Sequence, residues 1–270
     1  MKNTIEIKSS GIHFVDKNWG GFYTGSTYLI NGQPKSGKTS TALQYAYNIA
    51  SRGEVCVYFT NIRPRKLILN AYSQGLNLQP LIDDNKLIIL RMSPLKIDRI
   101  EQEKDAYLSE FLYEIIKIAD EFNPSGIVFD ELTPYLGFTD KDMFLDVFNE
   151  VVEALEDSLV TTVFVLKEAT STEKLNLAKQ LEDIVNGVID LNDQDTSGKP
   201  DKKDDKAKVG YPNSPFMDQH RIRLDSQFAY EPGSGQNECY EQAPVSNLLL
   251  TKRPDNYYEP DQVITSAGGL

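Results

Sequence analysis

Residues 28–50 read YLINGQPKSGKTSTALQYAYNIA and contain the motif from which the fold can be inferred. Gly32, Gly37, Lys38 and Thr39 match the phosphate-loop pattern G-x-x-x-x-G-K-[ST]. Glycines let a backbone approach a phosphate chain closely enough for its N–H groups to point at the anion. The pattern predicts that Lys38 contacts the β- and γ-phosphates of a nucleotide and that the Thr39 hydroxyl binds Mg2+. The candidate nucleotide-binding positions are Gly32, Gln33, Pro34, Lys35, Ser36, Gly37, Lys38, Thr39 and Ser40.

The residues around the loop supply the context that the motif needs. Residues 28–30 form a short apolar run that predicts a strand directly before the loop. After the loop, apolar residues recur at helical spacing as far as Ala50, and Gly53 is a suitable stop. The order strand, loop, helix therefore favours a nucleotide-binding loop over an ordinary Gly/Ser turn.

The composition limits the class of protein. A length of 270 residues with 40% hydrophobic and 25% charged residues predicts a globular chain with a substantial core. The net charge of −12 makes a nucleic-acid partner less expected, although a local basic patch would suffice for one. We expect neither a membrane span nor a secretory signal, and Cys56 and Cys239 show no metal-ligand spacing. These features predict a cytoplasmic protein.

A series of glycines and apolar residues precedes the loop. It consists of Gly11-Ile12, Val15-Asp16, Gly20-Gly21 and Gly25, followed by the strand at 28–30. In this order the series resembles the opening of the RecA-superfamily ATPases of the KaiC/RadA type, although Trp19 stands where the first glycine of that family's triplet falls. The resemblance covers roughly residues 11–191, with a weaker echo to residue 223. It implies a RecA-like P-loop fold that binds ATP with Mg2+.

The remaining periodicity predicts alternating strands and helices. Beyond 28–30, the expected strands are 55–59, 87–90, 127–131, 162–166, 187–191 and a strand within 219–230. Beyond the helix after the loop, the expected helices are 64–72, 98–121, about 139–155 and 173–186, and residues 11–25 read as a turn-rich lead-in. This order predicts an α/β fold with a mostly parallel central sheet flanked by helices, and with an irregular C-terminal tail.

The domain boundaries follow from composition. We expect one ATPase domain over residues 1–230, with its core at 11–191 and a flexible polar linker at 192–208. Residues 231–270 are rich in Pro, Gly, Ser, Asn and Gln and predict an irregular tail. ATP is expected at the carboxyl ends of the parallel strands.

A second chemical site is predicted where the apolar run 127–129 ends in Asp130 and Glu131. An aspartate at the end of a parallel strand, downstream of a phosphate loop, is typical of the Walker B strand and would hold Mg2+ through water. Glu131 has two interpretations. It is either the group that orients the attacking water or a solvated loop glutamate.

The usual catalytic carboxylate is missing from the chain. In the family that the sequence resembles, an acidic residue at the end of the strand that matches 55–59 activates water. Here these positions read Thr60, Asn61 and Ile62, and neither Asn61 nor Ile62 can act as a base. This departure argues against rapid hydrolysis more than against ATP binding, so whether the chain is an enzyme stays open.

Three basic residues complete the list of candidates. Lys167 follows the strand 162–166, where strands of the family end in a polar residue that senses the γ-phosphate; a surface lysine is the alternative. Arg221 and Arg223 resemble the K-x-R pair that, in the family, reaches the nucleotide of a neighbouring subunit. An exposed strand face explains this pair equally well.

These observations give one leading hypothesis and two alternatives. The first is a Mg-ATP-binding ATPase that acts as a nucleotide-dependent regulator or assembly switch, with Lys38 and Glu131 catalytic and Thr39 and Asp130 at the metal. A homo-oligomer or a protein partner would complete the site. The alternatives are a recombination or repair ATPase that binds single-stranded DNA, which the acidic charge disfavours, and a non-hydrolysing ATP-binding switch.

Overall fold

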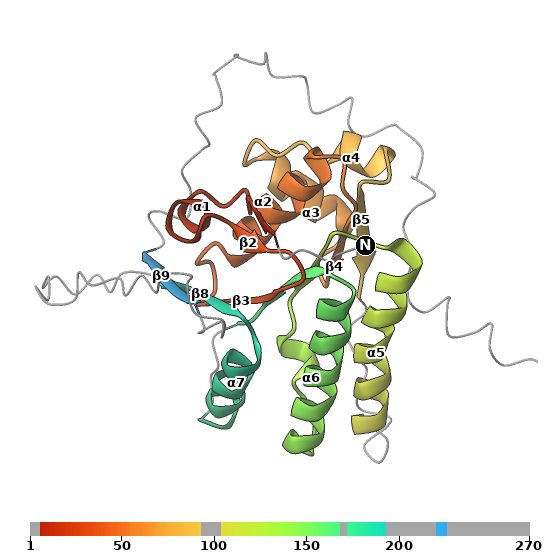
Figure 1. Ribbon diagram of the computed structural model, residues 1–270, viewed down its shortest axis with the longest axis vertical. Helices are drawn as coiled ribbons and strands as arrows, with labels where there is room; N and C mark the ends of the chain where they lie inside the picture. The colour runs from red at the N-terminus through yellow and green to blue at the C-terminus, as the bar shows by residue number, and fades with distance from the viewer. Residues whose placement is uncertain (1–5, 93–103, 168–171, 193–219, 226–270) are drawn as a thin grey trace, which may run out of the picture.

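The computed structural model describes residues 6–92, 104–167, 172–192 and 220–225. Its centre is a seven-stranded sheet in the order β5-β4-β6-β7-β3-β8-β9, and each neighbouring pair is parallel (Figure 1). The strands are β3 (Thr27–Gly32), β4 (Cys56–Thr60), β5 (Leu87–Arg91), β6 (Gly126–Asp130), β7 (Thr161–Val165), β8 (Gly187–Asn192) and β9 (His220–Asp225). Strands covered on both faces are apolar along their whole length, which explains the continuous apolar runs of the sequence.

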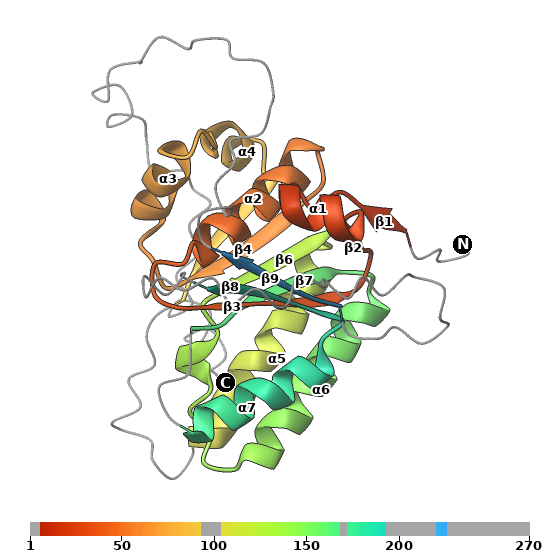
Figure 2. The same ribbon diagram turned by 90° about the vertical axis from the view of Figure 1, so that its left-hand side faces the viewer.

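Helices cover both faces of this sheet (Figure 2). One face carries α1 (His13–Trp19), α2 (Lys38–Ser51), α3 (Pro64–Tyr72) and α4 (Gln79–Asp83), and the other carries α5 (Lys104–Phe122), α6 (Lys141–Asp157) and α7 (Thr172–Ile184). The predicted α/β fold with a mostly parallel sheet between helices is confirmed. No helix in the described parts of the chain combines the length and the apolar character needed to cross a membrane.

Each face of the sheet has its own hydrophobic core. Phe129 and Phe164 belong to the cluster that packs beneath α5 and α6. Tyr28, Tyr45 and Tyr58 belong to the cluster on the side of α2. Because the sheet is sandwiched between these two cores, the strand ends are fixed relative to one another, and polar residues at those ends are held by the strands that precede them.

The segment before the loop differs from its prediction. The turn-rich lead-in expected at 11–25 was wrong for residues 13–19, which form α1 between two short antiparallel strands, β1 (Ile7–Lys8) and β2 (Phe22–Tyr23). Ile12 and Val15 are fully buried and anchor the helix. The Asp16 carboxylate accepts hydrogen bonds from the Ser10 N–H and hydroxyl, both at 2.7 Å. A helix of seven residues is too short to be stable alone, so burial and these hydrogen bonds supply its stability.

Other differences concern the ends of elements. Helix α5 is described from Lys104, and the earlier part of the helix predicted at 98–121 lies outside the described residues. Helix α4 was not predicted. Strand β8 extends to Asn192, the first residue assigned to the linker. The rest of the linker, Cys239 and the whole C-terminal tail at 231–270 lie outside the described residues, so the proposed domain division stays a prediction.

Candidate functional site

The loop that joins β3 to α2 is tightly folded around its glycines. Only glycine fits at position 32, because a Cβ atom there would lie 2.2 Å from the Leu191 carbonyl oxygen of the neighbouring strand β8. It would also lie 2.6 Å from the Ser36 hydroxyl. Lys35 and Gly37 adopt positive φ angles of 71° and 96°. Such left-handed angles bend the backbone sharply, and the second of them, at Gly37, is where the loop joins α2.

Lys38 is the first residue of α2 and returns its side chain into the loop. Its ammonium group donates to the carbonyl oxygens of Gly32 at 2.7 Å and Gln33 at 2.6 Å. The residue is only 8% exposed. Of the two lysines of the loop, Lys38 is thus directed inward, while Lys35 is exposed together with Gln33 and Pro34, and Ser40 is half-buried.

Asp130 ends β6 beside the start of α2. Its Oδ1 accepts a hydrogen bond from the Thr39 hydroxyl at 3.3 Å, and its Oδ2 accepts one from the Tyr58 hydroxyl at 2.9 Å. Burial raises the pKa of the Asp130 carboxyl and nearby Glu131 raises it further, whereas the two hydroxyls and Lys38 act in the opposite direction. Burial is also the main reason why the pKa of Tyr58 lies well above its ordinary value.

The residues of the loop fit a Mg2+-bound nucleotide triphosphate. The Ser36 hydroxyl is buried and has no hydrogen-bond partner among the described residues, although an unpaired buried donor costs about 1–3 kcal/mol. The helix that begins at Lys38 is 14 residues long, and its N-terminus favours an anion. A hydroxyl and a carboxylate, from Thr39 and Asp130, are the hard oxygen ligands that Mg2+ prefers. These donors would hold the phosphates and the metal together.

Asn61, which stands where the family has its catalytic carboxylate, lies next to this cluster. The Asn61 N–H donates to the Asp130 carbonyl oxygen at 3.3 Å, and the Tyr135 hydroxyl donates to Asn61 Oδ1 at 3.5 Å. An uncharged amide therefore stands at the end of β4, immediately beside Asp130. Glu131 follows Asp130 directly and is half-buried. It is the carboxylate next in sequence to the predicted metal ligand.

The three remaining candidates lie in or just after other strands of the sheet. Lys167 follows β7, its backbone N–H donates to the Thr133 hydroxyl at 2.9 Å, and its side chain is exposed. Arg221 and Arg223 lie in β9, in register with Val188 and Asp190 of β8. Strand β9 is separated from β3 by β8, so this pair belongs to the outer edge of the sheet.

Sequence reasoning missed Tyr58. A run of apolar residues buried on both faces gives no alternation to show which side chains share a face. One signal pointed to it: Tyr58 is the only residue of the run 55–59 with a hydroxyl group, and it stands two residues before the end of the strand. Residues two apart in a strand point to the same face, so Tyr58 shares the face of Thr60, the register partner of Asp130.

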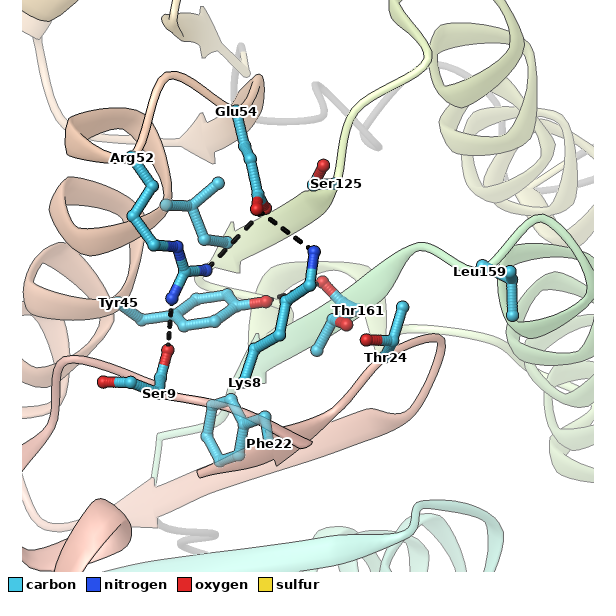
Figure 3. Close-up of a pocket in the computed structure, with 11 residues that line it drawn as sticks. Lys8, Ser9, Phe22, Thr24, Tyr45, Arg52, Glu54, Ser125, Leu159 and Thr161 are labelled. Atoms are coloured by element: carbon cyan, nitrogen blue, oxygen red, sulfur yellow. Dashed lines mark hydrogen bonds and ion pairs between the residues drawn. The ribbon is translucent and has the colours of Figure 1, made fainter. Parts of the chain in front are cut away.

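A small, partly open cavity lies away from the loop, at the amino end of the sheet (Figure 3). Its volume is about 50 Å³, too small for a nucleotide. Lys8 and Arg52 both pair with Glu54 at its rim, and the Tyr45 hydroxyl donates to the Thr161 carbonyl oxygen at 3.0 Å. Its charged groups therefore pair with one another, and the loop remains the candidate nucleotide site.

Comparisons with known proteins agree with the fold and the loop. The sequence model of the KaiC ATPase family matches residues 8–203. The circadian clock protein KaiC2 of Synechocystis is 28% identical over 156 residues, which are 57% of this chain and 26% of that protein. The circadian clock oscillator protein KaiC of Thermostichus vulcanus is 36% identical over 122 residues, 44% of this chain and 23% of that protein. The matched region thus spans about a quarter of the length of these relatives.

A solved structure shows the same fold. The crystal structure of a KaiC-like protein from the archaeon Pyrococcus horikoshii superposes with a TM-score of 0.57 at 24% sequence identity. The match covers 73% of this chain and 85% of that one. At this level of identity the likeness concerns the architecture of the domain.

Proposed function

The chain belongs to the KaiC family of ATPases, and on that premise we propose that it binds Mg-ATP in the loop of residues 32–40 and acts as a nucleotide-dependent regulator or assembly switch. The observation that carries the proposal is the contact between the Thr39 hydroxyl and Asp130 Oδ1. It joins the phosphate loop to the end of β6, two segments 91 residues apart, through a pair of groups suited to Mg2+.

The roles of the residues follow from their positions. Lys38 and the N-terminus of α2 would bind the phosphates, and Thr39 and Asp130 would hold the metal. Bound Mg2+ supplies neutralisation of the charge on the phosphate oxygens. The protein's own contribution is to hold these donors in place before the nucleotide arrives, which is the main source of catalysis in phosphoryl transfer.

The proposal also covers the hydrolysis of ATP. Asn61 has no carboxylate to accept a proton, so Glu131 is the group that we propose to orient water. Its place directly after Asp130 supports this role. The amide at Asn61 also supports a second function, an ATP-binding switch that hydrolyses slowly or not at all. Arg221 and Arg223 would act only if a neighbouring copy of the chain completes the site.

The proposal is tested by titrating the protein with ATP in a calorimeter, once with Mg2+ and once with EDTA. We expect binding that is strengthened by Mg2+. A wild-type protein without measurable affinity for Mg-ATP at millimolar concentration would contradict the proposal.

The Asp130→Asn variant should separate metal binding from stability. It removes the carboxylate, so we expect the affinity for Mg-ATP to fall by about 10- to 100-fold, the loss of one charge-assisted interaction. Because burial disfavours the charge of Asp130, the nucleotide-free variant should melt at a higher temperature, by about 2–4 °C for each ~1 kcal/mol gained. Calorimetry and thermal unfolding measure the two effects.

The matched control is Asp146→Asn, which changes an exposed aspartate in the interior of α6. It should change neither the affinity nor the melting temperature. An Asp130→Asn protein that binds Mg-ATP like the wild type would remove Asp130 from the metal site.

A further inference from the structure

Tyr58 is the least expected member of the cluster around Asp130. It lies within β4, opposite Val128 of β6, and is fully buried. From there its hydroxyl reaches the end of the neighbouring strand and donates to Asp130 Oδ2 at 2.9 Å. The Thr39 hydroxyl holds the other oxygen, Oδ1, at 3.3 Å. The two carboxylate oxygens are therefore bonded to two different hydroxyls from β4 and α2.

The bond to Tyr58 has a defined direction. An ionised carboxylate accepts hydrogen bonds and has no proton to donate, so the phenol is the donor. Asp130 is only 4% exposed, and little solvent is available to replace a donor that is lost. Without the phenol, Oδ2 would be a buried charged oxygen with one bond fewer, and the carboxylate would be less firmly oriented.

We propose that Tyr58 is a positioning residue for the metal site, which orients the Asp130 carboxylate with Oδ1 toward Thr39 and thereby raises the affinity for Mg2+. The proposal rests on the proposed binding of Mg-ATP. Hydrogen-bond partners behind a metal ligand change metal affinity by about 10- to 100-fold when they are removed. The Tyr58 hydroxyl bonds to Asp130 and, among the described residues, to none of the loop residues that would hold the phosphates, so its effect should be confined to the metal-dependent part of binding.

The protein contains a matched tyrosine for comparison. Tyr45 is also buried, and its hydroxyl donates to the Thr161 carbonyl oxygen at 3.0 Å, beside the cavity at the amino end of the sheet (Figure 3). Tyr45→Phe and Tyr58→Phe each remove one buried hydroxyl and one hydrogen bond. A role in folding alone would make the two variants behave alike, whereas a positioning role would make them differ in their response to Mg2+.

The experiment measures ATP binding by calorimetry at a series of Mg2+ concentrations and in EDTA, for the wild type, Tyr58→Phe and Tyr45→Phe. We expect Tyr58→Phe to need about tenfold more Mg2+ for the half-maximal increase in affinity. Its affinity for ATP in EDTA should stay within about twofold of the wild type. Tyr45→Phe should match the wild type in both measurements.

A double-mutant cycle gives an independent check. In an Asp130→Asn background, Tyr58→Phe should have no further effect on the Mg2+ dependence, because the carboxylate that it positions is already gone. Additive losses in the double variant would overturn the proposal, as would a single Tyr58→Phe variant with an unchanged Mg2+ requirement or with equal losses in Mg2+ and in EDTA.

The outcomes separate this inference from the function on which it rests. A wild-type protein without Mg2+-dependent ATP binding would overturn both. A wild-type protein that binds Mg-ATP, with a Tyr58→Phe variant that responds to Mg2+ identically, would overturn the positioning role and leave the proposed function standing.

Discussion

The Lys38→Ala variant is expected to lose at least about a hundredfold in affinity for Mg-ATP. The ammonium group of Lys38 is buried in the loop, where it makes hydrogen bonds of 2.7 and 2.6 Å to two backbone carbonyl oxygens. Charge-assisted hydrogen bonds contribute about 1.5–3 kcal/mol each, and two of them to phosphate oxygens would account for a factor of 10² or more. Calorimetric titration with Mg-ATP measures the loss, and steady-state turnover should fall with it.

The control for this variant is Lys66→Ala, which removes an exposed lysine on α3. It carries the same change in net charge, so it reports any general electrostatic effect on an anionic ligand. We expect its affinity to stay within about twofold of the wild type at 0.15 M salt, where distant surface charges are screened. If Lys38→Ala retained the wild-type affinity, nucleotide binding at this loop would be wrong.

The Glu131→Gln variant is expected to lose about a hundredfold in ATP turnover while its affinity for Mg-ATP changes little. A positioned base contributes about 10²–10⁴ to a rate, and glutamine preserves the shape of the side chain without accepting a proton. The lower end of that range is expected here, because positioning and charge neutralisation dominate phosphoryl transfer. Steady-state phosphate release and calorimetry give the two quantities.

Glu110→Gln, on the exposed side of α5, is the matched control and should leave turnover unchanged. Equal turnover in the wild type and in Glu131→Gln would show that Glu131 does not orient the water. A wild-type protein that binds Mg-ATP but has no turnover above the Lys38→Ala background would instead support the non-hydrolysing switch, the function that Asn61 favours.

The strands were predictable because they are buried on both faces. The run 55–59 is apolar throughout and the run 162–166 is apolar after Thr162, and the structure has β4 and β7 at these places, displaced by no more than one residue at either end. Helix α1 was missed for the opposite reason. It has only seven residues between glycines, and it depends on contacts of Ile12, Val15 and Asp16 that no local pattern announces.

Some residues of the site were likewise predictable from the sequence, and one was not. Lys38 and Thr39 belong to one continuous motif, and Asp130 ends an apolar run, so each was identifiable along the chain. Their meeting depends on strand order, since the carboxyl ends of parallel strands share one edge of the sheet. The role of Tyr58 could not be identified from the sequence, because it depends on which side chains of β4 lie on the same face of the sheet as Asp130. That information comes only from the register between β4 and β6.

The inward position of Lys38 gives the phosphates two competitors for its ammonium group, and both belong to the loop itself. The carbonyl oxygens of Gly32 and Gln33 accept two of the three hydrogen bonds that this ammonium group can donate. Where these bonds are exchanged for bonds to phosphate oxygens, a charged acceptor replaces a neutral one, and the measured affinity also contains the cost of breaking the bonds to the carbonyls. Substitutions in the loop that loosen the hold of these two carbonyls on the lysine would strengthen ATP binding without adding a single contact to ATP.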